Sequence, residues 1–168
     1  TCALPICADS IAMENTADVL TGGAGSDTLV VSYQGILGGI QVDLSASDVI
    51  TSIDGVSNSA VQTGFENIDL SAYGGFGSVI TGSSAANTIT GTSLADNITG
   101  GLGADNITGG AGNDAINLTE TTDSQDTVVF SAVASNGTDT ISGFTAGAGK
   151  DILKVTALAT LTDADGST

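Results

Sequence analysis

Acidic side chains recur in this sequence at a spacing of nine residues. Asp96, Asp105 and Asp114 follow one another at that interval, and Asn87 stands one interval earlier. An Ile lies two residues after each of these four positions. Carboxylate and carbonyl oxygens are the ligands that Ca²⁺ prefers, whereas Mg²⁺ requires a tighter octahedron. The spacing therefore predicts a periodic set of oxygen ligands suited to calcium.

The same register is present near the start of the chain and after the main series. Asp9, Asp18 and Asp27 are nine residues apart, and Asp123 follows Asp114 by nine. Seven of the 19 acidic residues thus fall into two series with nine-residue spacing, while Lys and Arg total 2. Asp and Gly also favour ordinary solvated turns. Columns of carboxylates with no basic side chain beside them would repel each other, however, so the pattern favours a bound cation.

The composition excludes several classes of function. The chain has 168 residues and a net charge of −17, and it contains no His. Two basic residues cannot neutralise nucleic-acid phosphates or hold an anionic membrane surface. Without His there is no Ser-His-Asp triad and no H-E-x-x-H zinc site. No apolar run approaches the roughly 18 residues of a membrane span. We expect no nucleic-acid partner, no membrane insertion and no catalytic residues in this chain.

The elements that must position the acidic residues are short strands and glycine turns. In residues 100–108, GGLGADNIT, the last three residues alternate as a strand with the Ile facing inward. The first six form a turn, in which Gly permits a positive φ and lets carbonyl groups converge. The Asp at the sixth position adds a carboxylate to those carbonyls. The repeats therefore predict an all-β solenoid in which oxygen atoms gather at the edges.

Three stretches match the pattern G-G-x-G-x-D-x-U-x, namely residues 22–30, 100–108 and 109–117. The sequence therefore resembles the RTX, or haemolysin-type calcium-binding, proteins. This resemblance implies a right-handed parallel β-roll in which two nonapeptides make one turn. It also implies that a loop and the next loop but one stack on the same edge and hold Ca²⁺ between them.

The resemblance further implies which residues bind the ion. Three carboxylate pairs are expected: Asp96 with Asp114, Asp105 with Asp123, and Asp9 with Asp27, while Asp18 and Asn87 occupy the same register position. The expected carbonyl ligands are those of Gly100, Leu102, Gly109, Ala111 and Gly112. About two to four ions are expected from this loop pairing and the ligand demand of Ca²⁺.

Some loops depart from the repeat pattern. Ser83 and Thr92 replace the second Gly of their repeats, Asn87 replaces the Asp, and residues 118–123 contain no Gly. We therefore expect the site at Asp96 and Asp114 to follow the pattern best, and the edge with Asn87 and Asp105 to follow it least.

The chain divides into five predicted segments. Residues 1–6, TCALPI, resemble the translated end of a sequencing adapter, so we expect them to be non-native, and the last segment has the look of a truncated end. The end of a first RTX block is expected at 7–30, and a β-rich insertion, which resembles those of S-layer members of the family, at 31–72. The main β-roll is expected at 73–123 and a C-terminal capping β segment at 124–168. Strands are expected at 39–44, 65–70, 126–130, 139–144 and 151–155, with a hairpin turn at Asp54-Gly55.

Three functions are compatible with these features. The first is a calcium-binding structural module of a secreted or cell-surface bacterial protein, of the S-layer or adhesin type, which is exported by type I secretion and folds on binding calcium outside the cell. Self-assembly and cell-surface polysaccharide are further possible partners of such a module. The second is the C-terminal calcium-binding and secretion region of an enzyme, a protease, lipase or epimerase. The third is an ice-binding or surface-binding solenoid with a Thr row at positions 81, 90, 99 and 108.

Overall fold

The computed structural model describes residues 10–13, 19–32, 38–47, 49–53, 55–57, 61–130 and 136–156. Every regular element within these ranges is a strand. No helix long and apolar enough to cross a membrane occurs among the described residues.

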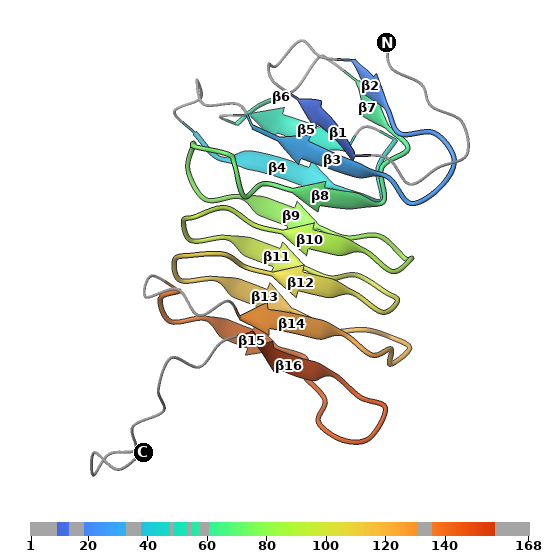
Figure 1. The fold of residues 1–168 in the computed structure, drawn as a ribbon, viewed down its shortest axis with the longest axis vertical. Coiled ribbons are helices and arrows are strands. Elements are labelled where there is room, and N and C mark those ends of the chain that lie inside the picture. The colour runs from blue at the N-terminus through green and yellow to red at the C-terminus, as the bar shows by residue number, and fades with distance from the viewer. Residues whose placement is uncertain are drawn as a thin grey trace.

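Two seven-stranded sheets run the length of the molecule as a stack of rungs (Figure 1). The first sheet has the strand order β1 (Ser10–Met13), β3 (Thr28–Val31), β8 (Asn67–Asp69), β10 (Thr88–Thr90), β12 (Asn106–Thr108), β14 (Thr127–Phe130) and β16 (Ile152–Val155). The second has the order β15 (Thr140–Ser142), β13 (Ala115–Asn117), β11 (Asn97–Thr99), β9 (Val79–Thr81), β4 (Ile40–Asp43), β5 (Ile50–Ile53) and β6 (Val56–Ser57). A separate pair joins β2 (Leu20–Thr21) to β7 (Gln62–Thr63).

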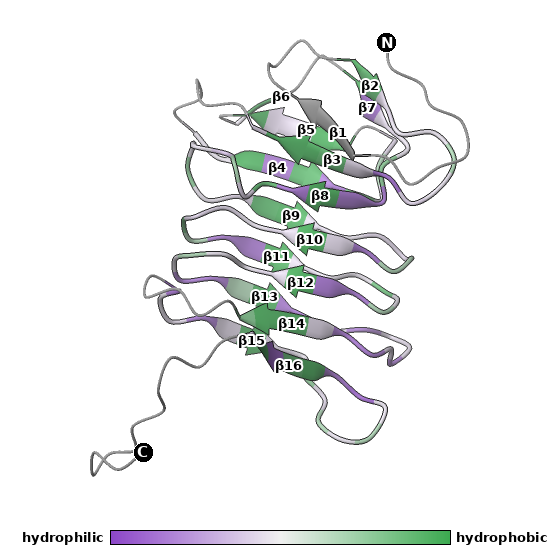
Figure 2. Cartoon of the chain, in the orientation of Figure 1, coloured by the Kyte–Doolittle hydropathy of each residue, from purple (hydrophilic) through white to green (hydrophobic). Residues whose placement is uncertain are grey.

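Successive nonapeptides alternate between the two sheets, and strands two repeats apart pair in parallel. Ile89 thus lies beside Ile107 in the first sheet, and Ile98 lies beside Ile80 and Ile116 in the second. All five are buried in one hydrophobic core. Figure 2 shows green, apolar residues in these strands, whereas the loops that join them are mostly pale, of intermediate hydropathy. The expected parallel β-roll is confirmed, because the nine-residue period places one Ile of every rung inside it.

The predicted insertion supplies rungs of the same roll. The expected strand at 39–44 is confirmed as β4, which pairs in parallel with β9. The expected strand at 65–70 is confirmed as β8, which lies between β3 and β10. Strands β5 and β6 continue the second sheet in antiparallel fashion, joined at the predicted hairpin turn, where Gly55 has φ +72°. Asp54 of that turn lies outside the described residues.

The predicted C-terminal segment also continues the stack. Its three expected strands are confirmed as β14, β15 and β16, and each pairs in parallel with the strand above it. The last strand is exposed along its whole length, with Leu153 52% exposed. The segment thus extends the described roll with rungs of the same kind, and its role as a cap stays a prediction.

Truncation of a central core side chain should be far more costly than truncation at this end. Ile98 is fully buried, so Ile98→Ala should lower the free energy of unfolding by about 2–5 kcal/mol. Ile152 is 43% exposed, and Ile152→Ala should cost less than about 1 kcal/mol. Denaturant unfolding in saturating calcium measures both values. Equal losses in the two variants would contradict a core that is centred on the repeat Ile residues.

Candidate metal site at the edges of the roll

One edge of the roll carries a column of carboxylates linked by backbone hydrogen bonds. The N–H of Ser78 donates to Oδ1 of Asp96 at 2.5 Å, and the N–H of Asp96 donates to Oδ1 of Asp114 at 2.9 Å. The N–H of Asp114 donates in turn to Oδ1 of Asp139 at 2.9 Å. Each of these Asp side chains ends the loop before its strand, so three described loops on this edge are held to the neighbouring rung by a carboxylate.

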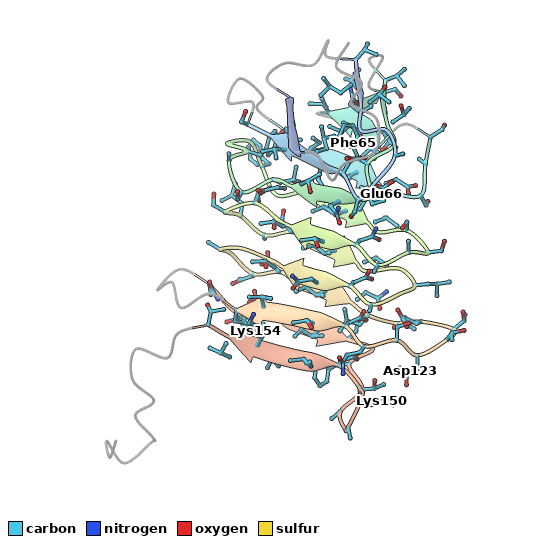
Figure 3. All side chains as sticks on the ribbon, turned by 45° about the vertical axis from the view of Figure 1, so that its right-hand side comes forward. Phe65, Glu66, Asp123, Lys150 and Lys154 are labelled. Atoms are coloured by element: carbon cyan, nitrogen blue, oxygen red, sulfur yellow. The ribbon has the colours of Figure 1, made fainter. Side chains whose placement is uncertain are left out.

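The opposite edge repeats the arrangement. Oδ1 of Asp105 accepts the N–H of Asn87 at 2.8 Å, and Oδ1 of Asp126 accepts the N–H of Asp105 at 2.9 Å. Oδ1 of Asp151 accepts the N–H of Asp126 at 3.0 Å. Nearer the N-terminal end, Oε2 of Glu66 accepts the N–H of the buried Asp27 at 2.8 Å. Glu66 lies on the same side of the roll as Asp123 and Lys150 (Figure 3).

The structure therefore places the predicted acidic residues unequally. It brings Asp96 and Asp114 together, and it stacks Asn87 on Asp105. The predicted pairing of Asp105 with Asp123 is wrong, because Asp126 occupies that position. The loop that ends at Asp126 is three residues longer than a repeat loop, so counting by nine stops too early.

Asp123 itself lies outside the column. It is 46% exposed and forms an ion pair with Lys150, at the lower end of the roll (Figure 3). The hydrogen bond from Lys150 lowers the pKa of its carboxyl. The other two predicted ligands of the first block, Asp9 and Asp18, lie outside the described residues.

Three column members were not predicted by the nine-residue count. They are Asp126, Asp139 and Asp151, and each stands directly before a strand, as Asp105 and Asp114 do. Their spacing from the member above is 21 or 25 residues, whereas the repeat spacing is 18. The signal that could have found them is the recurrence of Asp at the start of the sequences DTVVF, DTISGF and DILKV.

Two of the three loops that match the glycine-rich pattern leave a carboxylate oxygen without a donor. Oδ2 of Asp105 and Oδ2 of Asp114 are buried and make no hydrogen bond to any described residue. The second Gly of these loops, Gly101 and Gly110, has φ +104° and +115°, a conformation that Gly adopts without strain. These loops therefore each present one unsatisfied anionic oxygen.

The loops with a hydroxyl residue at the second position satisfy their own acceptors. Thr92 donates its N–H to Oδ2 of Asp96 at 2.7 Å, and its hydroxyl lies 3.1 Å from both carboxylate oxygens. Ser83 donates its N–H to Oδ1 of Asn87 at 2.7 Å, with its hydroxyl at 3.2 Å. We call these two arrangements hydroxyl clasps. They show what the departures from glycine achieve, because each supplies a second donor to the residue that ends its loop.

Burial makes the ionised carboxylates costly in the folded roll. It raises the pKa of Asp105 to about 7, with further contributions from the charges of Asp126 and Glu120, while the backbone hydrogen bond from Asn87 acts in the opposite direction. It likewise raises the pKa of Asp114 and of Asp126 to about 6, and it raises that of Asp96. A bound cation would offset this cost, because it favours the ionised form.

Some predicted carbonyl ligands lie where successive rungs touch. A side chain on Gly82 would collide with the carbonyl oxygen of Gly100, and one on Gly91 would collide with that of Gly109. The carbonyl oxygen of Gly112 lies against Gly137 in the same way. Whether these carbonyls, and those of Leu102 and Ala111, coordinate an ion stays a prediction.

The residues at both edges fit Ca²⁺. The carboxylates there, together with the predicted backbone carbonyls, offer oxygen atoms alone, and this hard cation prefers oxygen ligands. The buried, unsatisfied oxygens of Asp105 and Asp114 are acceptors that need a positive partner. Among the described residues, no basic side chain approaches either one within ion-pairing distance. Calcium held there would neutralise charge that the protein leaves uncompensated.

The Thr92 clasp should stabilise its rung by a measurable amount. Thr92→Val removes the hydroxyl donor to the buried Asp96 and should cost about 1.5–3 kcal/mol of unfolding free energy. Thr88→Val makes the same change at an exposed strand position and should alter stability by less than about 0.5 kcal/mol. Denaturant unfolding in saturating calcium compares them. Two equal effects would show that the hydroxyl bond to Asp96 is not what stabilises the rung.

Two stretches of the chain, residues 14–31 and 81–116, match the family described as the RTX calcium-binding nonapeptide repeat, in four copies. No curated protein matches the chain. RTX nonapeptide repeats bind calcium ions. Together with the all-strand parallel roll and its stacked edge carboxylates, this shows that the chain carries a module of RTX calcium-binding repeats.

Proposed function

We propose that the chain is a structural module that folds on binding calcium and belongs to a secreted or cell-surface bacterial protein of the S-layer or adhesin type. The observation that carries this proposal is the pair of edge columns, in which buried carboxylates stack with almost no basic side chains available to them. Such columns are unfavourable alone and become favourable with a cation between them.

The free energy gained from burying apolar side chains, compared with the entropy lost on ordering the loops, supports folding that depends on calcium. Each repeat rung buries one Ile, such as Ile98 or Ile107, while its loop must order several residues. Fixing a residue costs roughly 1–2 kcal/mol of backbone entropy, and glycine loses the most. Burying one aliphatic side chain returns only about 1.5–3 kcal/mol. Calcium binding supplies free energy that the core of a rung lacks.

The proposed extracellular location follows from calcium affinity. Sites of extracellular modules bind calcium with dissociation constants of about 10⁻⁴–10⁻³ M, so they are empty at cytosolic concentrations. A chain of this kind would stay unfolded before export and fold outside the cell. Type I secretion is the export route that the RTX resemblance implies.

Two alternatives differ in what they require. The C-terminal region of a secreted protease, lipase or epimerase would need a catalytic domain in sequence beyond these residues, and recovery of the full reading frame would distinguish it. An ice-binding solenoid would need one flat row of Thr side chains. The roll divides that row between its two sheets, with Thr81 and Thr99 on one and Thr90 and Thr108 on the other. This division favours the structural module over an ice-binding face.

Calcium should convert the chain from a largely disordered state to β structure. Circular dichroism across a calcium titration of the full chain should show a cooperative gain of β signal, and excess chelator should reverse it. The physical reason is that the ion neutralises the buried columns and thereby favours the folded state. Magnesium at equal concentrations serves as the control. A spectrum that calcium leaves unchanged would overturn the proposed function.

Removal of one unsatisfied carboxylate should weaken this response. Asp114→Asn keeps an oxygen that can accept the N–H of Asp96, but it removes the negative charge of the buried carboxylate. The calcium concentration at the midpoint should therefore rise at least about tenfold, which corresponds to about 1.4 kcal/mol of binding free energy. Asp43→Asn is the matched control, because the Asp43 carboxylate accepts only from Ser45 of its own turn among the described hydrogen bonds. A midpoint shift of the same size in both variants would contradict a ligand role for Asp114.

A further inference from the structure

Three carboxylates meet at the edge of the roll just after the last matched repeat. Asp105, Glu120 and Asp126 each place a carboxylate oxygen within 4.8 Å of the other two, the one such group among the described residues. Two oxygens on opposite sides of a bound Ca²⁺ are about 4.6–5.2 Å apart, twice the usual ligand distance. The three oxygens therefore lie close enough together for one Ca²⁺ to contact all of them.

A second observation points to a ligand there. Asp105 is only 2% exposed, and its Oδ2 accepts no hydrogen bond from any described residue. Oε1 of Glu120 is also buried without a donor, while its Oε2 accepts the N–H of Ser124 at 2.7 Å. Two buried anionic oxygens are thus left unsatisfied on neighbouring loops. Such a group costs several kcal/mol unless a cation pairs with it.

The loop that carries Glu120 differs from the repeat loops. Residues 118–126, LTETTDSQD, contain no Gly and lie beyond the matched stretch that ends at residue 116. Without glycine, this loop lacks the backbone freedom by which the repeat loops converge their carbonyls. In this loop the Glu120 side chain, rather than converging carbonyls, brings an oxygen to the same edge. The hydrogen bond from Ser124 holds the Glu120 carboxylate against its own loop.

The nearest basic group is engaged elsewhere. Lys150 lies on the next loop of this edge, where it forms its ion pair with Asp123 (Figure 3). The other lysine, Lys154, lies in β16, outside the edge loops. Neither lysine ion-pairs with the cluster in the described structure. No described basic side chain therefore neutralises the charge of the three carboxylates.

We propose that Asp105, Glu120 and Asp126 form a calcium site built from side chains, which terminates the series of glycine-loop sites. This site rests on the proposed function only for the identity of the ion, which is taken to be calcium. The three carboxylates supply at least three of the six to eight oxygens that Ca²⁺ takes, and bidentate binding and water can complete the shell. The site ties the last matched repeat strand of this edge, β12, to β14, which lies beyond the matched stretch.

Counting calcium ions tests this site. The number of ions bound per folded full-length chain is measured by equilibrium dialysis at saturating calcium, with circular dichroism to report folding. Glu120→Gln should bind one ion fewer than the unmodified chain. Asp123→Asn removes the same charge from the same loop and should bind the full number. An unchanged count in Glu120→Gln would overturn the site, and so would an equal loss in both variants.

A measurement without substitution covers the case in which Glu120→Gln does not fold. In a crystal structure of the unmodified chain grown with calcium, an ion should lie about 2.3–2.6 Å from oxygens of all three residues. A calcium-loaded roll with no ion at that position would overturn the site while leaving the proposed function intact. An unmodified chain that binds no calcium at all would instead overturn the proposed function, and the site with it.

Discussion

The whole roll depends on one recurring hydrogen bond, in which the side-chain oxygen that ends a loop accepts the backbone N–H of the rung above. Asp96 to Asp114 on one edge, and Asp105 to Asp126 on the other, are examples at 2.9 Å. These bonds set the loops in register where no strand ladder can do so. They also require an acceptor beside a buried backbone, and an Asp acceptor brings its charge with it. The stacking that aligns the loops thus creates the charge that the molecule must neutralise.

The second oxygen of each carboxylate shows how the chain handles that charge. Thr92 clasps Asp96 with its N–H and hydroxyl, and Thr145 donates to Oδ2 of Asp151 from the last described loop at 2.8 and 3.2 Å. The loops with two leading glycines have no hydroxyl at that position, and Oδ2 of Asp105 and of Asp114 makes no hydrogen bond to any described residue. A Gly at the second position therefore does more than permit a turn, since it also removes the side chain that would otherwise occupy the acceptor.

Sequence periodicity predicts the fold well because the core obeys it strictly. One Ile per nine residues specifies every rung from β9 to β13, and the parallel roll follows. The same count fails after Asp114, where the column continues at Asp126 and Asp139 after longer loops. A rung requires only a side-chain acceptor directly before its strand, and the loop that leads to this acceptor can vary in length. The sequence did not predict the hydroxyl clasps either. A Thr at the position of the second Gly reads as a departure from the repeat pattern, and only the structure shows its hydroxyl beside the carboxylate.

The need for a cation is consequently concentrated in the middle of the roll. Toward the N-terminal side, residues 82–96 carry the two hydroxyl clasps, and Asn87 brings no charge at all. Toward the C-terminal side, residues 143–151 carry the Thr145 clasp and Lys150. Between them lie residues 100–126, which carry the unsatisfied carboxylate oxygens of Asp105, Asp114 and Glu120. Because rungs in a stack contact only their neighbours, losing the cation there would weaken the contact between the parts of the roll on either side. Calcium bound at residues 100–126 would thus link these two parts, in keeping with the proposed dependence of folding on the ion.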